Sequence, residues 1–180
     1  MIISIRGTNG AGKSTLVREI MSRYEKTLIQ YPAKDKRKPM GYVCSNFEKT
    51  KGFFVAGHYE IANGGIDTLP SLECAYDLAL KHHQLGLDVI LEGKNFTEPP
   101  TWILKQHEDK VDIRVVLIDI PLSQCIKAVR ARGHKIKEDT IAALHAKSRK
   151  QFEVFKKAGV HVFKGNRKQC LEKVASWLRA

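Results

Sequence analysis

The sequence predicts an α/β fold of three layers, in which helices cover both faces of a central, mostly parallel sheet. Apolar runs of strand length alternate with longer amphipathic segments along the 180 residues. The runs at residues 88–92 and 113–120 are predominantly apolar, which is typical of parallel strands buried on both faces. No repeat, low-complexity tract or linker interrupts the alternation, so residues 1–180 are expected to form a single domain.

Each expected strand is a short apolar run, and each expected helix is a segment with apolar residues at helical spacing. The expected strands are residues 2–6, 27–31, 42–47, 52–57, 88–92, 113–120 and 160–164. The expected helices are residues 13–24, 69–85, 100–108, 121–132, 138–158 and 168–178. The helix over 69–85 has the clearest apolar face, and Gly86 is placed to end it.

The composition is that of a globular protein without a membrane partner. Hydrophobic residues make up 43%, and no run approaches the roughly 20 apolar residues that span a bilayer. The amino-terminal strand lacks the basic flank and cleavage site of a signal peptide, so a cytoplasmic protein is expected. The four cysteines form no C-x-x-C pair, which indicates reduced and mostly buried thiols. The oligomeric state stays open.

The positive charge is concentrated in the last third of the chain. Lysine and arginine number 31 against 19 acidic residues, a net charge of +12. Residues 121–180 carry 15 basic and 4 acidic residues, a net of +11, whereas residues 1–120 carry 16 and 15, a net of +1. This asymmetry favours a polyanionic partner such as DNA. The alternative is a basic solvated surface that includes the arginines of a phosphoryl-transfer lid.

Between the first expected strand and the first expected helix lies a G-x-x-x-x-G-K-[ST] string, the pattern of a phosphate-binding loop, or P-loop. Its glycines let backbone N–H groups turn toward phosphate oxygens, and the helix start adds the positive end of its dipole. Lys13 is expected to reach the β- and γ-phosphates of ATP, and Ser14 to ligate Mg²⁺. The expected nucleotide-binding residues of the loop are Gly7, Thr8, Asn9, Gly10, Ala11, Gly12, Lys13, Ser14 and Thr15.

Two expected strands end in a carboxylate. Glu92 follows the apolar residues Val89, Ile90 and Leu91 and resembles the Walker-B acid, which points at the metal or the attacking nucleophile. An ordinary carboxylate at a strand end is the alternative. Asp119 ends the next strand, and it either plays a similar part or caps the helix that follows. The sequence does not decide between these two roles.

A basic segment at residues 127–140 follows the penultimate strand, where a lid over the triphosphate is expected. Arg130 and Arg132 are the candidates for stabilising charge on the transferred group, and a solvated helix end is the alternative. Asn166 lies in the loop after the last strand. Analogy with nucleotide-binding folds places it beside the adenine.

The polar residues after the strand at 52–57 are candidates for binding an acceptor. His58, Tyr59, Glu60 and Asp67 are of types that orient a hydroxyl group or accept its proton. Tyr59 or Phe53 is expected to stack on a base. A turn with capped polar groups is the alternative.

Five strings carry a resemblance to small P-loop kinases of tailed bacteriophages over residues 1–132. They are Ile5-Arg6-Gly7-Thr8, Arg37-Lys38-Pro39-Met40-Gly41-Tyr42-Val43, Gly57-His58-Tyr59-Glu60, Gly64-Gly65-Ile66-Asp67-Thr68 and Leu91-Glu92-Gly93. Some members of that family phosphorylate 5-hydroxymethyluracil within phage DNA, and others are nucleotide kinases. Residues 33–36 depart from the pattern in being more highly charged.

The resemblance implies a P-loop kinase fold and phosphoryl transfer from Mg·ATP to the hydroxymethyl group of 5-hydroxymethyluracil in DNA. Arg37, His58, Tyr59 and Glu60 would bind the acceptor, and Glu92 or Asp67 would be the base. The alternatives are a deoxynucleoside monophosphate kinase and a nucleotide-dependent DNA-binding ATPase.

Overall fold

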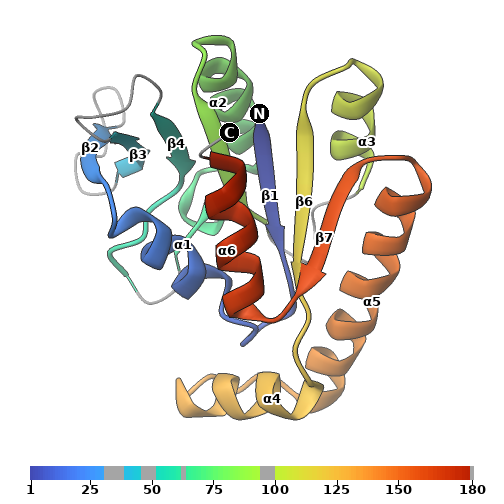
Figure 1. Cartoon of the computed structure of the whole chain (residues 1–180). Coiled ribbons are helices and arrows are strands. Elements are labelled where there is room, and N and C mark those ends of the chain that lie inside the picture. Colours follow the sequence, from blue (N-terminus) through green and yellow to red (C-terminus); the bar gives the residue numbers. More distant parts are fainter. Residues whose placement is uncertain (31–38, 46–51, 62–63, 94–99, 179–180) are drawn as a thin grey trace.

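A computed structural model describes residues 1–30, 39–45, 52–61, 64–93 and 100–178. Within these residues, seven strands form one sheet in the order β2-β3-β4-β5-β1-β6-β7 (Figure 1). The strands are β1 (Ile2–Arg6), β2 (Glu25–Gln30), β3 (Pro39–Ser45), β4 (Phe53–Ala56), β5 (Asp88–Glu92), β6 (Ile113–Ile118) and β7 (His161–Gly165). The five strands from β4 to β7 in this order are parallel, and β2 and β3 add an antiparallel edge. The expected mostly parallel sheet is confirmed.

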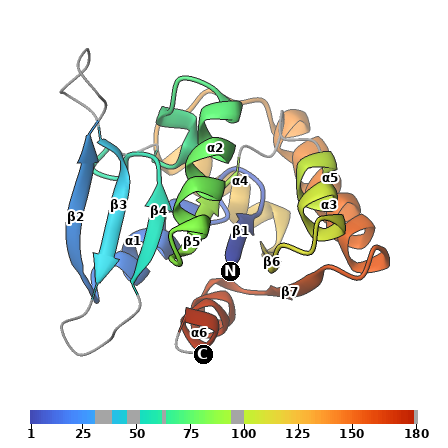
Figure 2. The ribbon, with the colours of Figure 1, turned by 90° about the horizontal axis from the view of Figure 1, so that it is seen from above.

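Helices cover both faces of the sheet, which makes the three layers (Figure 2). They are α1 (Lys13–Met21), α2 (Leu72–Gln84), α3 (Thr101–Glu108), α4 (Leu122–Ala131), α5 (Glu138–Lys157) and α6 (Arg167–Leu178). The apolar sides of α1 and α6 pack on one face of the sheet, and α4, which lies across the carboxyl ends of the strands, contributes to the same core (Figure 1). The apolar sides of α2 and α3, and the end of α5, pack on the other face. The expected α/β/α arrangement is therefore also confirmed.

Two expected helices begin or end elsewhere for local reasons. α1 ends at Met21, and the ring of Tyr24 instead packs edge-on against Phe53 with centroids 4.8 Å apart. The expected helix over 69–85 begins later: α2 starts only after Ser71, and a separate 3₁₀ turn at Ile66–Thr68 precedes it. The Ser71 side chain accepts a hydrogen bond from the Cys74 amide at 3.0 Å, which is a helix cap that the apolar periodicity does not reveal.

All four cysteines are free thiols, and three of them are buried, as the sequence predicts. Burial raises the pKa of both Cys44 and Cys170 to about 12. None of the helices in the described ranges combines the length and the apolar character that crossing a bilayer requires.

Candidate active site

The loop between β1 and α1 brings a cation and a hydroxyl group to the carboxyl end of the sheet. The Lys13 ammonium donates hydrogen bonds to the carbonyls of Gly7 at 2.9 Å and Thr8 at 3.3 Å. Burial lowers the pKa of Lys13, and the carboxylates of Glu92 and Asp67 counteract that shift. The Ser14 hydroxyl donates to Glu92 Oε1 at 2.6 Å. The loop, the end of β5 and the 3₁₀ turn therefore meet at one place.

These groups line a cavity of about 270 Å³ with chemically different walls. The loop contributes Asn9, Gly10, Gly12, Lys13 and Ser14. The wall on the side of β5 and the 3₁₀ turn contributes Gly64, Asp67, Glu92 and Gly93. The wall between α4 and α5 contributes Val129, Arg132, His134 and Ile136. Cations and carboxylates thus line one space large enough for the phosphates of a nucleotide and a small acceptor group.

Glu92 is buried, with 6% of its surface exposed, and Oε1 of its carboxylate accepts the Ser14 hydrogen bond. Burial raises the pKa of Glu92, whereas Lys13 and hydrogen bonding to Ser14 and Tyr59 pull it back. Burial also raises the pKa of the Tyr59 phenol well above its ordinary value, and the charge of Glu92 and its hydrogen bonding raise it further. Glu92 is therefore a buried carboxylate in the cavity wall, held next to Ser14 and Tyr59.

The side chains of the cavity fit a magnesium ion held jointly with a nucleotide. The described residues contain no cluster of three or more His, Cys, Asp or Glu side chains that would hold a metal by itself. Mg²⁺ in kinase sites takes few ligands from the protein and the rest from phosphates and water. The Ser14 hydroxyl, with the Glu92 carboxylate hydrogen-bonded to it, would provide oxygen atoms next to such an ion.

Four of the predicted nucleotide-binding residues of the loop do not line the cavity: Gly7, Thr8, Ala11 and Thr15. Thr8 is buried, and its hydroxyl lies 3.4 Å from the Ile141 carbonyl at the start of α5. Ala11 is also buried, and Gly7 contributes its carbonyl to the Lys13 ammonium. Thr15 lies on the far side of the loop, in a second hollow described below. The loop therefore separates two hollows rather than lining only one.

The segment after β4 folds back on itself, and two glycines make this possible. Gly57 has φ +92°, and a Cβ there would lie 2.1 Å from the Gly65 carbonyl oxygen. Gly65 has φ +93°, and its Cβ would lie 3.1 Å from Glu92 Oε2. The Thr68 hydroxyl accepts from the His58 amide at 2.8 Å and donates to the Gly65 carbonyl at 2.7 Å. This double turn brings Gly64 and Asp67 to the cavity beside Glu92.

The structure does not bring the other predicted acceptor residues to the cavity wall. His58 is buried, and its Nε2 lies 3.2 Å from Glu60 Oε2, whereas Glu60 itself is exposed. Tyr59 and Phe53 are 4% and 3% exposed, so neither ring is placed to stack on an incoming base. Both rings belong to the core between the sheet and α1. Arg37 lies outside the described residues.

The two predicted lid arginines lie on different sides of the end of α4. Arg132 and His134 line the cavity. Arg130 forms an ion pair with Glu138 and lines a shallow hollow on the outer side of α4. Positions two residues apart on a helix differ by about 200° in direction, so one arginine faces the loop and the other faces away. The geometry thus supports Arg132 as a phosphate-binding residue, whereas the ion pair of Arg130 with Glu138 connects α4 to α5.

A second hollow, a groove of about 1050 Å³, extends from the P-loop to α6. Asn166 lines it together with Thr15 and Arg132, and the expected contact of Asn166 with the adenine stays a prediction. The Asn166 side chain also caps α6, since its Oδ1 accepts from the Gln169 amide at 3.0 Å. Arg132 and the loop residues Gly10 and Gly12 line both the groove and the cavity, so the two hollows adjoin at the P-loop.

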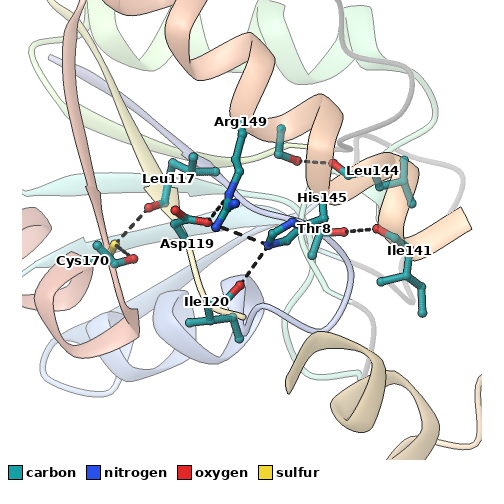
Figure 3. Close-up of polar contacts among 11 residues, drawn as sticks. Thr8, Leu117, Asp119, Ile120, Ile141, Leu144, His145, Arg149 and Cys170 are labelled. Carbon is teal, nitrogen blue, oxygen red and sulfur yellow. Dashed lines mark hydrogen bonds and ion pairs between the residues drawn. The ribbon is translucent and has the colours of Figure 1, made fainter. Parts of the chain in front are cut away.

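Asp119 has neither of its two predicted roles. Its Oδ1 accepts a hydrogen bond from Arg149 Nε at 2.8 Å and lies 3.9 Å from His145 Nε2 (Figure 3). No side chain caps the start of α4, and Asp119 is not part of the cavity wall. His145 Nε2 lies 3.0 Å from the Ile120 carbonyl, so two side chains of α5 are held at the end of β6. Asp119 therefore anchors α5 next to the P-loop.

Sequence reasoning did not select three residues that the structure places at the two hollows. His134 and Gly64 line the cavity, and both lie within segments that the motifs had already indicated. Arg167 lies against Gly12, with its Cδ 3.3 Å from the position that a Cβ on Gly12 would take. Arg167 and Gly12 are 155 positions apart in the sequence, and no local pattern connects the two.

Replacing Gly57 with alanine is expected to destabilise the fold by about 3 kcal/mol or more, because the new methyl group overlaps backbone that cannot move independently. Gly86→Ala is the matched control: Gly86 also has a positive φ, +84°, but nothing lies within 4 Å of its Cβ position. It should lose only about 1–2 kcal/mol, the conformational part of the penalty. Urea unfolding of both variants measures the difference, and equal losses would show that the double turn tolerates a side chain.

The sequence and the structure were compared with known proteins. No family model matches the sequence. A 5-hmdU DNA kinase of Pseudomonas phage PaMx11 is 35% identical over 132 residues, which are 73% of this chain and 68% of that protein. Deoxyadenosine kinase from M. mycoides with bound dATP superposes with a TM-score of 0.52 at 17% identity, covering 100% of both chains. The YorR protein of Bacillus subtilis in complex with phosphorylated GDP gives 0.54 at 17% identity, covering 99% of this chain and 96% of that one. At such identities these structures show a common fold.

Proposed function

Because this chain belongs to the family of phage 5-hmdU DNA kinases, we propose that it transfers the γ-phosphoryl group of ATP to the hydroxymethyl group of 5-hydroxymethyluracil in DNA. The observation that carries the proposal is the buried carboxylate of Glu92, which lies in the cavity wall and accepts a hydrogen bond from Ser14 of the phosphate-binding loop. A hydroxyl acceptor has to lose its proton during the transfer, and a carboxylate can accept that proton.

The cations and the carboxylates of the cavity suit different substrates. Lys13 from the loop and Arg132 from the end of α4 would neutralise the β- and γ-phosphates of the donor. Asp67 and Glu92 favour a neutral alcohol, because a nucleoside monophosphate brings its own negative charge and would be repelled by carboxylates. An alcohol must also lose a proton, and a carboxylate within reach can accept it.

In the proposed reaction, the acceptor oxygen attacks the γ-phosphorus while the bond to the β–γ bridging oxygen breaks and ADP leaves. Glu92 orients the acceptor hydroxyl and takes its proton, and that proton later passes to solvent. Lys13 and Arg132 hold the phosphate oxygens in line for the attack. Mg²⁺, when bound, neutralises charge on the β- and γ-oxygens, and Ser14 would hold it there.

The charge of the last third of the chain supports DNA as the form in which the acceptor base is presented. The cavity wall formed by Arg132 and His134 continues into the exposed residues Lys135 and Lys137. Residues 121–180 as a whole carry a net charge of +11. Binding a free nucleotide requires far fewer positively charged side chains than this. A base within a duplex would have to leave the stack, which costs a few kcal/mol.

The proposal is tested with γ-labelled ATP and three acceptors: DNA containing 5-hydroxymethyluracil, the same DNA with thymine, and mixed deoxynucleoside monophosphates. Label should enter only the first. The KM for that DNA should rise at least about tenfold between roughly 50 and 200 mM salt, because two phosphate contacts already produce such a loss. Label in the monophosphates alone would identify a nucleotide kinase. Release of inorganic phosphate with no labelled acceptor would identify an ATPase.

A further inference from the structure

An arginine lies directly against the P-loop on the side opposite the cavity. Arg167 is the first residue of α6, and its Cδ and Nη1 lie 3.3 Å and 4.0 Å from the position that a Cβ on Gly12 would take. Gly12 immediately precedes the lysine and serine of the loop. The guanidinium group is therefore held beside the backbone that cradles the phosphates, on the wall of the groove that Arg132 lines as well.

The presence of Arg167 at the start of α6 is not explained by a contribution to the stability of that helix. Arg167 and Lys168 open α6, and no acidic residue occurs in its first turn. The amino end of a helix carries a partial positive charge, so a cation there is unfavourable. Among the described residues no ion pair with Arg167 is found, and its side chain is exposed. A residue that weakens its own helix and lies on a phosphate-binding loop is explained by an anion that binds between them.

The backbone around Arg167 is fixed in place. The Asn166 amide donates to Gln169 Oε1 at 2.9 Å, and the Gln169 amide donates back to Asn166 Oδ1 at 3.0 Å. The Gly165 carbonyl accepts from the Asp119 amide at 2.9 Å, which joins this loop to the end of β6. The start of α6 is thus held relative to the P-loop before any ligand binds, which fixes the backbone from which Arg167 extends.

We propose that Arg167 binds the α-phosphate of the donor nucleotide, so that Arg132 and Arg167 hold the triphosphate from the two sides of the P-loop. Lys13 and Ser14 assign the β- and γ-phosphates to the cavity, and the groove beyond Gly12 receives the α-phosphate and the nucleoside. A guanidinium suits this position because it binds phosphate through two parallel N–H groups. The inference rests on the proposed use of a nucleoside triphosphate donor.

The test is the affinity of wild type and Arg167→Ala for ATP, ADP and adenosine, measured by calorimetry without DNA. The dissociation constants for ATP and ADP should rise about tenfold, because a charge-assisted contact is lost, while adenosine binding stays unchanged. Arg167→Lys should recover part of the loss. In kinetics, KM for ATP should rise while kcat at saturating ATP and KM for DNA stay near the wild-type values.

Lys173→Ala is the matched control, since it removes one positive charge from the same helix. Lys173 lies over the rings of Phe163 and Trp177, at 5.9 Å and 5.4 Å from their centroids, and should not affect ATP binding. The melting temperature of Arg167→Ala should equal or exceed that of wild type, because an unfavourable charge leaves the helix start. Unchanged ATP affinity in Arg167→Ala, or equal weakening in Lys173→Ala, would overturn the inference. A wild-type protein that binds ATP but phosphorylates another acceptor would refute only the proposed function.

Discussion

Replacing Lys13 with alanine will lower kcat about 1000-fold or more while the protein stays folded. The ammonium lies at the P-loop, bonded to the Gly7 and Thr8 carbonyls, where it can turn to the phosphate oxygens as charge develops on them. Removing one pre-organised donor from such a site costs about 100- to 1000-fold, and Lys13 carries a full charge in addition. Single-turnover transfer from γ-labelled ATP to DNA measures the loss.

The folded state of this variant is checked by circular dichroism and thermal unfolding. Burial disfavours the charged form of Lys13, so its removal should not lower the melting temperature greatly. Lys13→Met, which keeps most of the volume, should be as inactive as Lys13→Ala. Either variant with more than about a tenth of wild-type turnover would remove Lys13 from the transition state.

Glu92→Gln is expected to lower kcat about 100- to 10000-fold with little change in the affinity for ATP. Glutamine keeps the size of the side chain and an oxygen for the Ser14 hydroxyl, but it cannot accept the proton of the acceptor. Steady-state kinetics with DNA containing 5-hydroxymethyluracil measure the effect, and calorimetry with ATP separates donor binding from transfer.

Asp67→Asn is the matched control for this prediction. Asp67 lines the same cavity but is exposed, whereas Glu92 is buried and accepts the hydrogen bond of Ser14. The loss in Asp67→Asn should therefore be much smaller, about tenfold or less. A larger loss in Asp67→Asn than in Glu92→Gln would assign the base to Asp67 instead.

The parts of the site that local sequence specifies could be predicted without the structure. The loop pattern places Lys13 and Ser14, and the apolar run of β5 ending in Glu92 places that carboxylate at the same edge of the sheet. Both predictions depend only on neighbouring residues and on the rule that parallel strands present their carboxyl ends together.

The remaining features depend on contacts between distant segments. Whether Tyr59 faces solvent or core depends on how β4 packs on α1, and the structure buries it. Arg130 and Arg132 look equivalent in the sequence, but the direction of α4 sends only Arg132 to the cavity. The partner of Asp119 is Arg149 on α5, thirty residues along the chain, and no spacing rule predicts that pair.

The order of strands in the sheet has a consequence for biosynthesis. β1 lies between β5 and β6, so its two neighbours are translated roughly 85 and 110 residues after it. At about 5–20 residues per second, a ribosome takes on the order of 5–20 seconds to supply both. The P-loop that follows β1 can take up its geometry only when β6 has emerged. Nucleotide can therefore stabilise the finished domain by mass action, but it cannot guide the early stages of its folding.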